Sequence, residues 1–67
     1  MSEEIARCHA LFTYLVLWSH STEWNVEYRD GKYIATTDDP NQFAPPIARS
    51  FAEAQQVWSE WFKCQRG

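Results

Sequence analysis

One dipeptide, Asp30-Gly31, constrains the fold of this chain more than any other feature, because it lies between two short runs of strand-forming residues. Asp-Gly favours the type I′ turn of a two-residue β-hairpin, in which both central residues need positive φ angles. Counting outward from that turn pairs Trp24 with Thr37 at the far end of the hairpin. The sequence therefore predicts an antiparallel hairpin over residues 24–37.

The same register assigns the strand residues to two faces, because side chains alternate along a strand. One face is apolar and aromatic, with Trp24, Val26, Tyr28, Tyr33, Ala35 and Thr37. The other face is mostly polar, with Asn25, Glu27, Arg29, Lys32, Ile34 and Thr36. We expect the first face to pack on the core and the second to contact water.

A helix is predicted before the hairpin. Ser2 is a suitable N-cap, acidic residues follow it in the first turn, and residues 19–22 end the segment. The predicted core stripe recurs at helical spacing as Ile5, Cys8, Phe12 and Leu15. A buried strand over Leu11–Trp18 is the alternative, because this stretch is rich in residues that favour sheets.

A second helix is predicted from Phe51, since Ser50 and Glu53 form a capping-box pattern. Its apolar stripe is Phe51, Ala54, Trp58, Trp61 and Phe62. Between hairpin and helix, a turn at residues 38–41 and the pair Pro45-Pro46 mark the longest irregular stretch. Residues 47–49 are expected to add a short third strand at a sheet edge.

These elements predict a small α+β fold that forms one domain over residues 1–67. The expected order is helix, two- or three-stranded antiparallel sheet, helix, with both helices on one sheet face. That order is similar to the topology of the double-stranded-RNA-binding domain, whose last helix begins with a lysine-rich phosphate-binding cluster. Here the corresponding stretch is Ser50-Phe-Ala-Glu-Ala-Gln55, so the resemblance implies topology and not RNA binding.

Charge and hydropathy limit the binding partners and the cellular location that we expect for the protein. The net charge is −3, and six basic residues are scattered among nine acidic ones, which argues against direct nucleic-acid binding through phosphate contacts. The apolar run Ala10–Trp18 is shorter than the roughly 20 residues that span a bilayer. Glu3 and Glu4 also occupy the place of a basic signal-peptide region, so we expect a cytoplasmic protein without membrane contact.

No motif indicates catalysis, a metal or a cofactor, so we expect a protein that is not an enzyme. The potential metal ligands lack a closely spaced pair, and they are Cys8, His9, His20 and Cys64. The two cysteines are expected to be reduced thiols, although a disulfide between the helices is conceivable. A serine next to a histidine occurs at Ser19-His20, where ordinary capping explains both residues.

The last sequence feature that bears on function is the aromatic content of four Trp, three Tyr and four Phe. Part of it fills the core, and the rest suggests a contact surface, because Trp and Tyr dominate binding hot spots. We expect a non-catalytic protein-binding module that inhibits or modulates a larger protein or nucleoprotein complex. In size and character the chain resembles phage-encoded inhibitors, including anti-CRISPR proteins. The candidate anchors are Trp18, Trp24, Phe43 and Trp61, with Asp38 and Asp39 as steering charges.

Two alternatives accompany this interpretation. A homodimer through the first helix or an edge strand is compatible with it. A single-stranded nucleic-acid binder would instead stack bases on Trp24, Tyr28 and Tyr33. That function requires the aromatic face to be exposed, whereas the predicted packing covers it.

Overall fold

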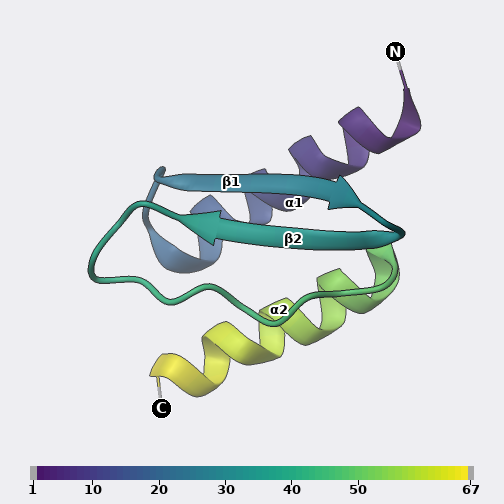
Figure 1. Cartoon of the computed structure of the whole chain (residues 1–67). Coiled ribbons are helices and arrows are strands. Elements are labelled where there is room, and N and C mark those ends of the chain that lie inside the picture. Colours follow the sequence, from purple (N-terminus) through teal and green to yellow (C-terminus); the bar gives the residue numbers. More distant parts are fainter. Residues whose placement is uncertain (1, 67) are drawn as a thin grey trace.

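The computed structural model describes residues 2–66, without the side chain of Arg66. Its elements are α1 (Glu3–Ser19), β1 (Trp24–Arg29), β2 (Lys32–Thr37) and α2 (Phe51–Arg66). Figure 1 shows the hairpin as one layer and the two helices as the other, with the long connection after β2 passing along α2. This arrangement confirms the predicted α+β fold.

The hairpin has the predicted register. Trp24 pairs with Thr37 and Arg29 with Lys32, and both turn residues have positive φ angles, 53° at Asp30 and 74° at Gly31. These values match a type I′ turn, whose twist suits the strands that it joins. Local turn chemistry is therefore sufficient to set the pairing of the whole hairpin.

Helix α1 begins and ends where the sequence predicts. The Ser2 hydroxyl accepts a hydrogen bond from the Ile5 N–H at 3.2 Å, and the first turn is acidic. At the other end, His20 adopts a left-handed conformation (φ 59°), and its N–H donates to the Val16 carbonyl at 2.9 Å. The alternative of a strand over Leu11–Trp18 is wrong, because this segment continues the helix.

The core-facing line of α1 differs from the predicted stripe. Leu11 and Leu15 are fully buried, whereas Ile5 is 59% exposed and Leu17 is 63% exposed. The cause is that α1 contacts both β1 and α2, so its most buried line lies between two neighbours. Hydrophobic periodicity predicts an apolar helix here, but it does not predict which residues of a wide apolar face are the most buried.

The expected third strand is reduced to a single bridge. Ala48 pairs with Tyr33, and the two residues exchange N–H···O bonds of 2.7 and 3.1 Å. The ladder stops there because the next residues that would face β2 are Pro46, which has no N–H, and Ser50, which caps α2. The N–H of Arg49 faces away from β2 and donates to the Glu53 carboxylate. The Ser50 hydroxyl accepts from the Glu53 N–H at 3.1 Å, so half of the capping box forms as predicted and the carboxylate reaches one residue further back.

The core is assembled from all four elements and from Ala48. Its buried apolar members are Leu11, Leu15, Trp24, Tyr33, Ala35, Ala48, Ala54, Trp58 and Phe62. Trp58 is fully buried, and its indole N–H donates to the Pro46 carbonyl at 2.7 Å. This bond attaches the long connection to α2 and holds Ala48 against β2.

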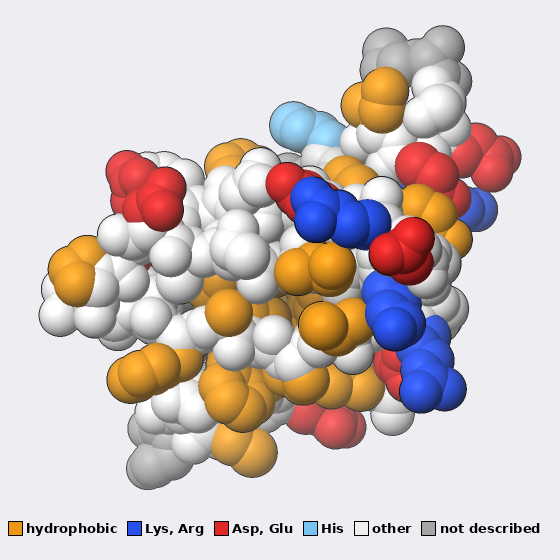
Figure 2. Space-filling model, viewed as in Figure 1, with side chains coloured by type: hydrophobic (Ala, Val, Ile, Leu, Met, Phe, Trp, Pro, Cys, Tyr) orange, Lys and Arg blue, Asp and Glu red, His pale blue; other side chains and the backbone are white. Residues whose placement is uncertain are grey.

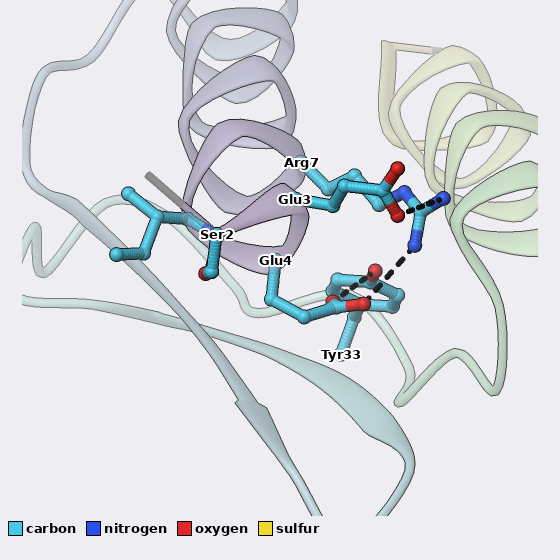
Figure 3. A network of polar contacts seen from close by, with 6 residues as sticks. Ser2, Glu3, Glu4, Arg7 and Tyr33 are labelled. Carbon is cyan, nitrogen blue, oxygen red and sulfur yellow. Dashed lines mark hydrogen bonds and ion pairs between the residues drawn. The ribbon is translucent and has the colours of Figure 1, made fainter.

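A polar network joins the first turn of α1 to β2 (Figure 3). The Tyr33 hydroxyl donates to the Glu4 carboxylate at 2.6 Å, and Arg7 binds the same carboxylate at 3.0 Å. Burial of the phenol, followed by its bond to Glu4, raises the pKa of Tyr33 to about 12. The network therefore holds a neutral phenol next to a carboxylate.

Candidate protein-contact surface

Three segments meet at the end of the molecule opposite the hairpin turn: the last turn of α1, the turn after β2 and the last turns of α2 (Figure 1). A pocket of about 290 Å³ lies between them. Its lining residues are Trp18, Ser19, His20, Asn41, Gln42, Phe43, Phe62 and Gln65. We call this pocket, together with the adjacent Asp38 and Asp39, the loop-end surface.

Local hydrogen bonds hold the acidic turn in place. The Asp39 carboxylate accepts from the Asn41 N–H at 2.8 Å, and the Asp39 carbonyl accepts from the Gln42 N–H at 3.1 Å. The N–H of Asp38 donates to the Glu23 carbonyl at 3.1 Å. The carboxylate of Asp39 therefore has a structural role in an Asx turn, whereas the side chain of Asp38 is exposed.

Phe43 projects from this turn with 69% of its surface exposed, the largest value among the large apolar side chains. Trp18 is half-buried, and its ring stacks with Tyr14 at 5.4 Å and lies 6.0 Å from Phe62. An exposed phenylalanine on a hydrogen-bonded turn, next to a pocket with aromatic walls, can bind an apolar side chain with little ordering of its own backbone.

The structure places the other two predicted anchors differently. Trp24 is only 7% exposed; its indole N–H donates to the Ser19 hydroxyl at 2.7 Å, and its ring meets Phe62 edge-on at 5.7 Å. It therefore supports the pocket from within the core and does not present a contact surface. Trp61 is half-buried against the core and does not line the pocket.

Sequence reasoning missed the α2 side of this pocket. Phe62 and Gln65 reach it only because the end of α2 lies next to the end of α1, and no local pattern reports that. His20 was recognisable as a residue that ends α1. Its position in the pocket wall depends on the later turn at residues 41–43.

Charge is distributed unevenly between the two ends. Figure 2 shows Lys and Arg side chains interspersed with acidic ones at the hairpin-turn end of the visible face, whereas the acidic side chains at the opposite end have no Lys or Arg beside them in this view. The exposed Glu23 lies next to β1 at the loop end, with Asp38 close to it through the backbone bond to Glu23. The loop-end surface is thus apolar with an acidic margin, which suits a partner with basic residues around an apolar contact.

A second surface lies along β1, and we call it the β1-edge groove. It has a volume of about 500 Å³ and is lined by Glu4, Ile5, Cys8, Val26, Glu27, Tyr28 and Arg29. Cys8 and Cys64 are both free thiols. Burial raises the pKa of Cys8, so its thiol is less readily ionised than an exposed one.

Tyr28 differs from the prediction that its face is covered, since it is 43% exposed in the groove. Tyr33 and Phe51, whose rings are 6.4 Å apart, fill the space under this end of the hairpin. The ring of Tyr28 packs on Tyr33 at 4.7 Å and remains at the rim. Because Trp24 and Tyr33 are buried, two of the three rings proposed for base stacking are not accessible.

Comparison with known proteins adds no assignment: no protein family, curated protein or solved structure matches the chain. Neither α1 nor α2, as far as each is described, is long and apolar enough to cross a membrane. Within residues 2–66, the structure does not bring three His, Cys, Asp or Glu side chains together as metal ligands.

Proposed function

We propose that this protein is a non-catalytic protein-binding module that uses its loop-end surface to occlude or modulate a larger protein or nucleoprotein complex. The observation that carries the proposal is the exposed Phe43 ring beside a pocket with aromatic walls and an acidic margin. Anchors of this kind supply much of the binding energy of an interface when a partner covers them. In size and charge such a module is comparable to phage-encoded inhibitors, which act by covering a functional surface.

Three features support the proposal. The turn that directly precedes Phe43 is held by hydrogen bonds of residues 38–42, so binding requires little further ordering of this turn. Asp38 and Asp39 add negative charge at the margin, which accelerates encounter with a basic surface. Trp24 and Phe62 form a packed base under the pocket, so the shape of the contact surface is maintained by the core.

Site-specific photo-crosslinking in a lysate of the source cells tests the proposal. A benzoylphenylalanine in place of Phe43 is expected to crosslink to one dominant protein, identified by mass spectrometry. The same probe in place of Ile47, which is 58% exposed in the same connection, is the matched control. Equal crosslinking from both positions, or none from position 43, would contradict the proposal.

A charge variant then tests the acidic margin. Asp38→Asn/Asp39→Asn removes both negative charges and matches the charge change of the control, and Asn at position 39 retains the acceptor that holds the Asx turn. We expect slower association with the captured protein and a weaker dependence on salt. Glu60→Lys on the exposed side of α2 is the control, and an equal effect there would show that only net charge matters.

A further inference from the structure

The outer edge of β1 carries backbone groups that the hairpin does not use. In a hairpin with a two-residue turn, the residues that flank the turn exchange hydrogen bonds, and this pattern alternates along the strand. Arg29 and Lys32 flank the turn here. The groups that point away from β2 therefore belong to Trp24, Val26 and Tyr28. Within the described part of the chain, no backbone hydrogen bond from outside the hairpin reaches these three residues.

The opposite edge of the hairpin is closed, because the outward groups of Tyr33 bond to Ala48. Edge strands that stay unpaired are often very short or carry charged side chains, above all lysine, a proline, a bulge or an inward-pointing charge. The charged residues of β1 are Glu27 and Arg29, and both lie on the polar face. The six residues of β1, Trp24–Arg29, include no proline or lysine and pair with β2 without a bulge. Its inward-facing side chains are all uncharged. Thus β1 is an edge that is built to accept another strand.

An apolar helix flank adjoins this edge. Ile5 and Cys8 of α1 line the β1-edge groove together with Val26 and Tyr28. Ile5 is 59% exposed although it is apolar. The half-buried Phe12 continues the same side of α1 at helical spacing. A strand added to β1 would therefore bring covering side chains to an apolar surface as well as hydrogen bonds to the backbone.

We propose that two copies of this chain form a symmetric dimer in which their β1 strands pair antiparallel about Val26, making one four-stranded sheet. Only a register that keeps both pairs of helices on the same sheet face is allowed, because a one-residue shift exchanges the faces. Among the registers that meet this condition, those centred on Val26 and on Glu27 pair five residues of β1 with the second copy, whereas those centred on Asn25 or on Tyr28 pair only three. In each of them the outward backbone groups of one copy meet those of the other.

The charges on the polar face select the register centred on Val26. That register places Arg29 opposite Glu23 of the second copy, and it places Asn25 opposite Glu27. Each contact occurs twice because of the two-fold symmetry. A register centred on Asn25 would place Glu23 opposite Glu27, and one centred on Glu27 would place that residue opposite itself. Like charges directly opposite each other are unfavourable, so of the two registers that pair five residues of β1, only the one centred on Val26 keeps the outward charges complementary.

The proposed assembly is closed. After β1 pairs with β1 of a second copy, the two outer edges of the enlarged sheet are both β2, and each is already bridged by Ala48. No further strand can add at that bridge, so the arrangement ends at a dimer and does not propagate into a fibre. The two apolar flanks of α1 lie on the same face and next to the two-fold axis, where each covers the other.

This inference goes beyond the proposed function, because the loop-end surface and the β1-edge groove share no lining residue. An experiment can therefore contradict dimerisation without contradicting partner binding, or the reverse.

Sedimentation velocity of the full chain tests dimerisation. Over concentrations from about 1 µM to about 1 mM, which bracket weak to moderate association, it is expected to show a shift from monomer to dimer. A monomer throughout this range would overturn the proposal.

A charge-swap experiment tests the register itself. Arg29→Glu and Glu23→Arg each create two like-charge contacts, so each variant alone is expected to dimerise at least about tenfold more weakly. An equimolar mixture of the two variants restores both opposite-charge contacts and is expected to form a heterodimer. Lys63→Glu, which makes the same charge change on the exposed side of α2, is the control and is expected to leave dimerisation unchanged.

Folding of each variant is checked by circular dichroism, because Arg29 also binds Glu27 of its own strand at 2.7 Å. Both variants are expected to retain the parental spectrum, since these side chains are exposed. If the folded variants remain monomeric when mixed, or if Lys63→Glu weakens the dimer equally, the register centred on Val26 is wrong.

Discussion

The two edges of the hairpin have different surroundings. At the β2 edge, Tyr33 bonds to Ala48 and is 2% exposed. At the β1 edge, its cross-strand partner Tyr28 is 43% exposed, and no segment outside the hairpin bonds to its backbone within the described residues. The difference arises because the chain after β2 turns back and Ala48 bonds to the outer edge of β2. A hairpin thus acquires one closed and one open edge from a connection outside it.

The largest expected effect comes from opening the closed edge. Trp58→Ala removes a fully buried indole and its bond to the Pro46 carbonyl, so the segment that carries Ala48 loses its attachment to α2. We expect a loss of about 3–5 kcal/mol in unfolding free energy, measured by urea titration. For a domain of this size such a loss is comparable to the total stability.

Trp58→Phe separates packing from the hydrogen bond. It keeps most of the apolar volume and leaves the Pro46 carbonyl without its donor, so we expect a smaller loss, of about 1–3 kcal/mol. If both variants were as stable as the parent, the connection would be held against β2 by other contacts, and the comparison of the edges would lose its physical basis.

An intermediate effect is expected from backbone N-methylation, which compares the edges directly. Methylation of the Ala48 nitrogen, in a chemically synthesised chain, removes its 3.1 Å bond to the Tyr33 carbonyl and is expected to cost about 1–3 kcal/mol. Methylation of Val26 removes a donor that the monomer does not use. At concentrations where the protein is monomeric, we expect it to change stability by less than about 0.5 kcal/mol. Equal costs at the two positions would show that β1 is not an open edge.

The smallest effect is a dependence on alkaline pH at the closed edge. The pKa of Tyr33 is raised from 10.0 to about 12 in the folded protein, first by burial and then by the bond to Glu4. Because the folded state holds this proton more tightly, the associated stability is complete below pH 10 and is lost as the pH rises toward 12. Tyr33→Phe is expected to remove this part of the pH dependence of unfolding.

Tyrosinate absorbance provides the matching measurement. The difference between the titration curves of the parent and of Tyr33→Phe is expected to have its midpoint near pH 12. Tyr28→Phe, at the open edge, is the control for the loss of one phenol. A midpoint for Tyr33 close to 10 would show that its phenol is not held in a buried bond to Glu4.

Much of the fold was predictable because it depends on contacts between residues close in the chain. Asp30-Gly31 specifies the turn and hence the register, and Ser2 and Ser50 mark the helix starts through bonds to residues three positions later. The sheet, predicted to have two or three strands, has two, and the segment expected as a third strand forms a single bridge for a related reason. Strand propensity at residues 47–49 is limited on one side by Pro46, which cannot donate to the ladder, and on the other by Ser50, which caps α2.

The candidate contact surface was predictable only in part. Phe43 and Asp38 lie in a segment with turn-forming residues, so their exposure follows from composition. Trp24 was proposed as an anchor because tryptophan is frequent at interfaces, yet Ser19 and Phe62 enclose it. Residue type indicates the capacity for contact, whereas the surrounding packing decides whether a ring supports the core or presents a surface.

By itself, the sequence determined the secondary structure of this protein, its hairpin register and the two faces of its sheet, because turn dihedrals, capping bonds and alternation act over a few residues. Only the tertiary structure decided which hairpin edge stays open and which aromatic rings are buried. Those outcomes depend on contacts such as Tyr33 to Glu4 and Trp58 to Pro46, and many chain paths with the same local pattern would place these partners elsewhere.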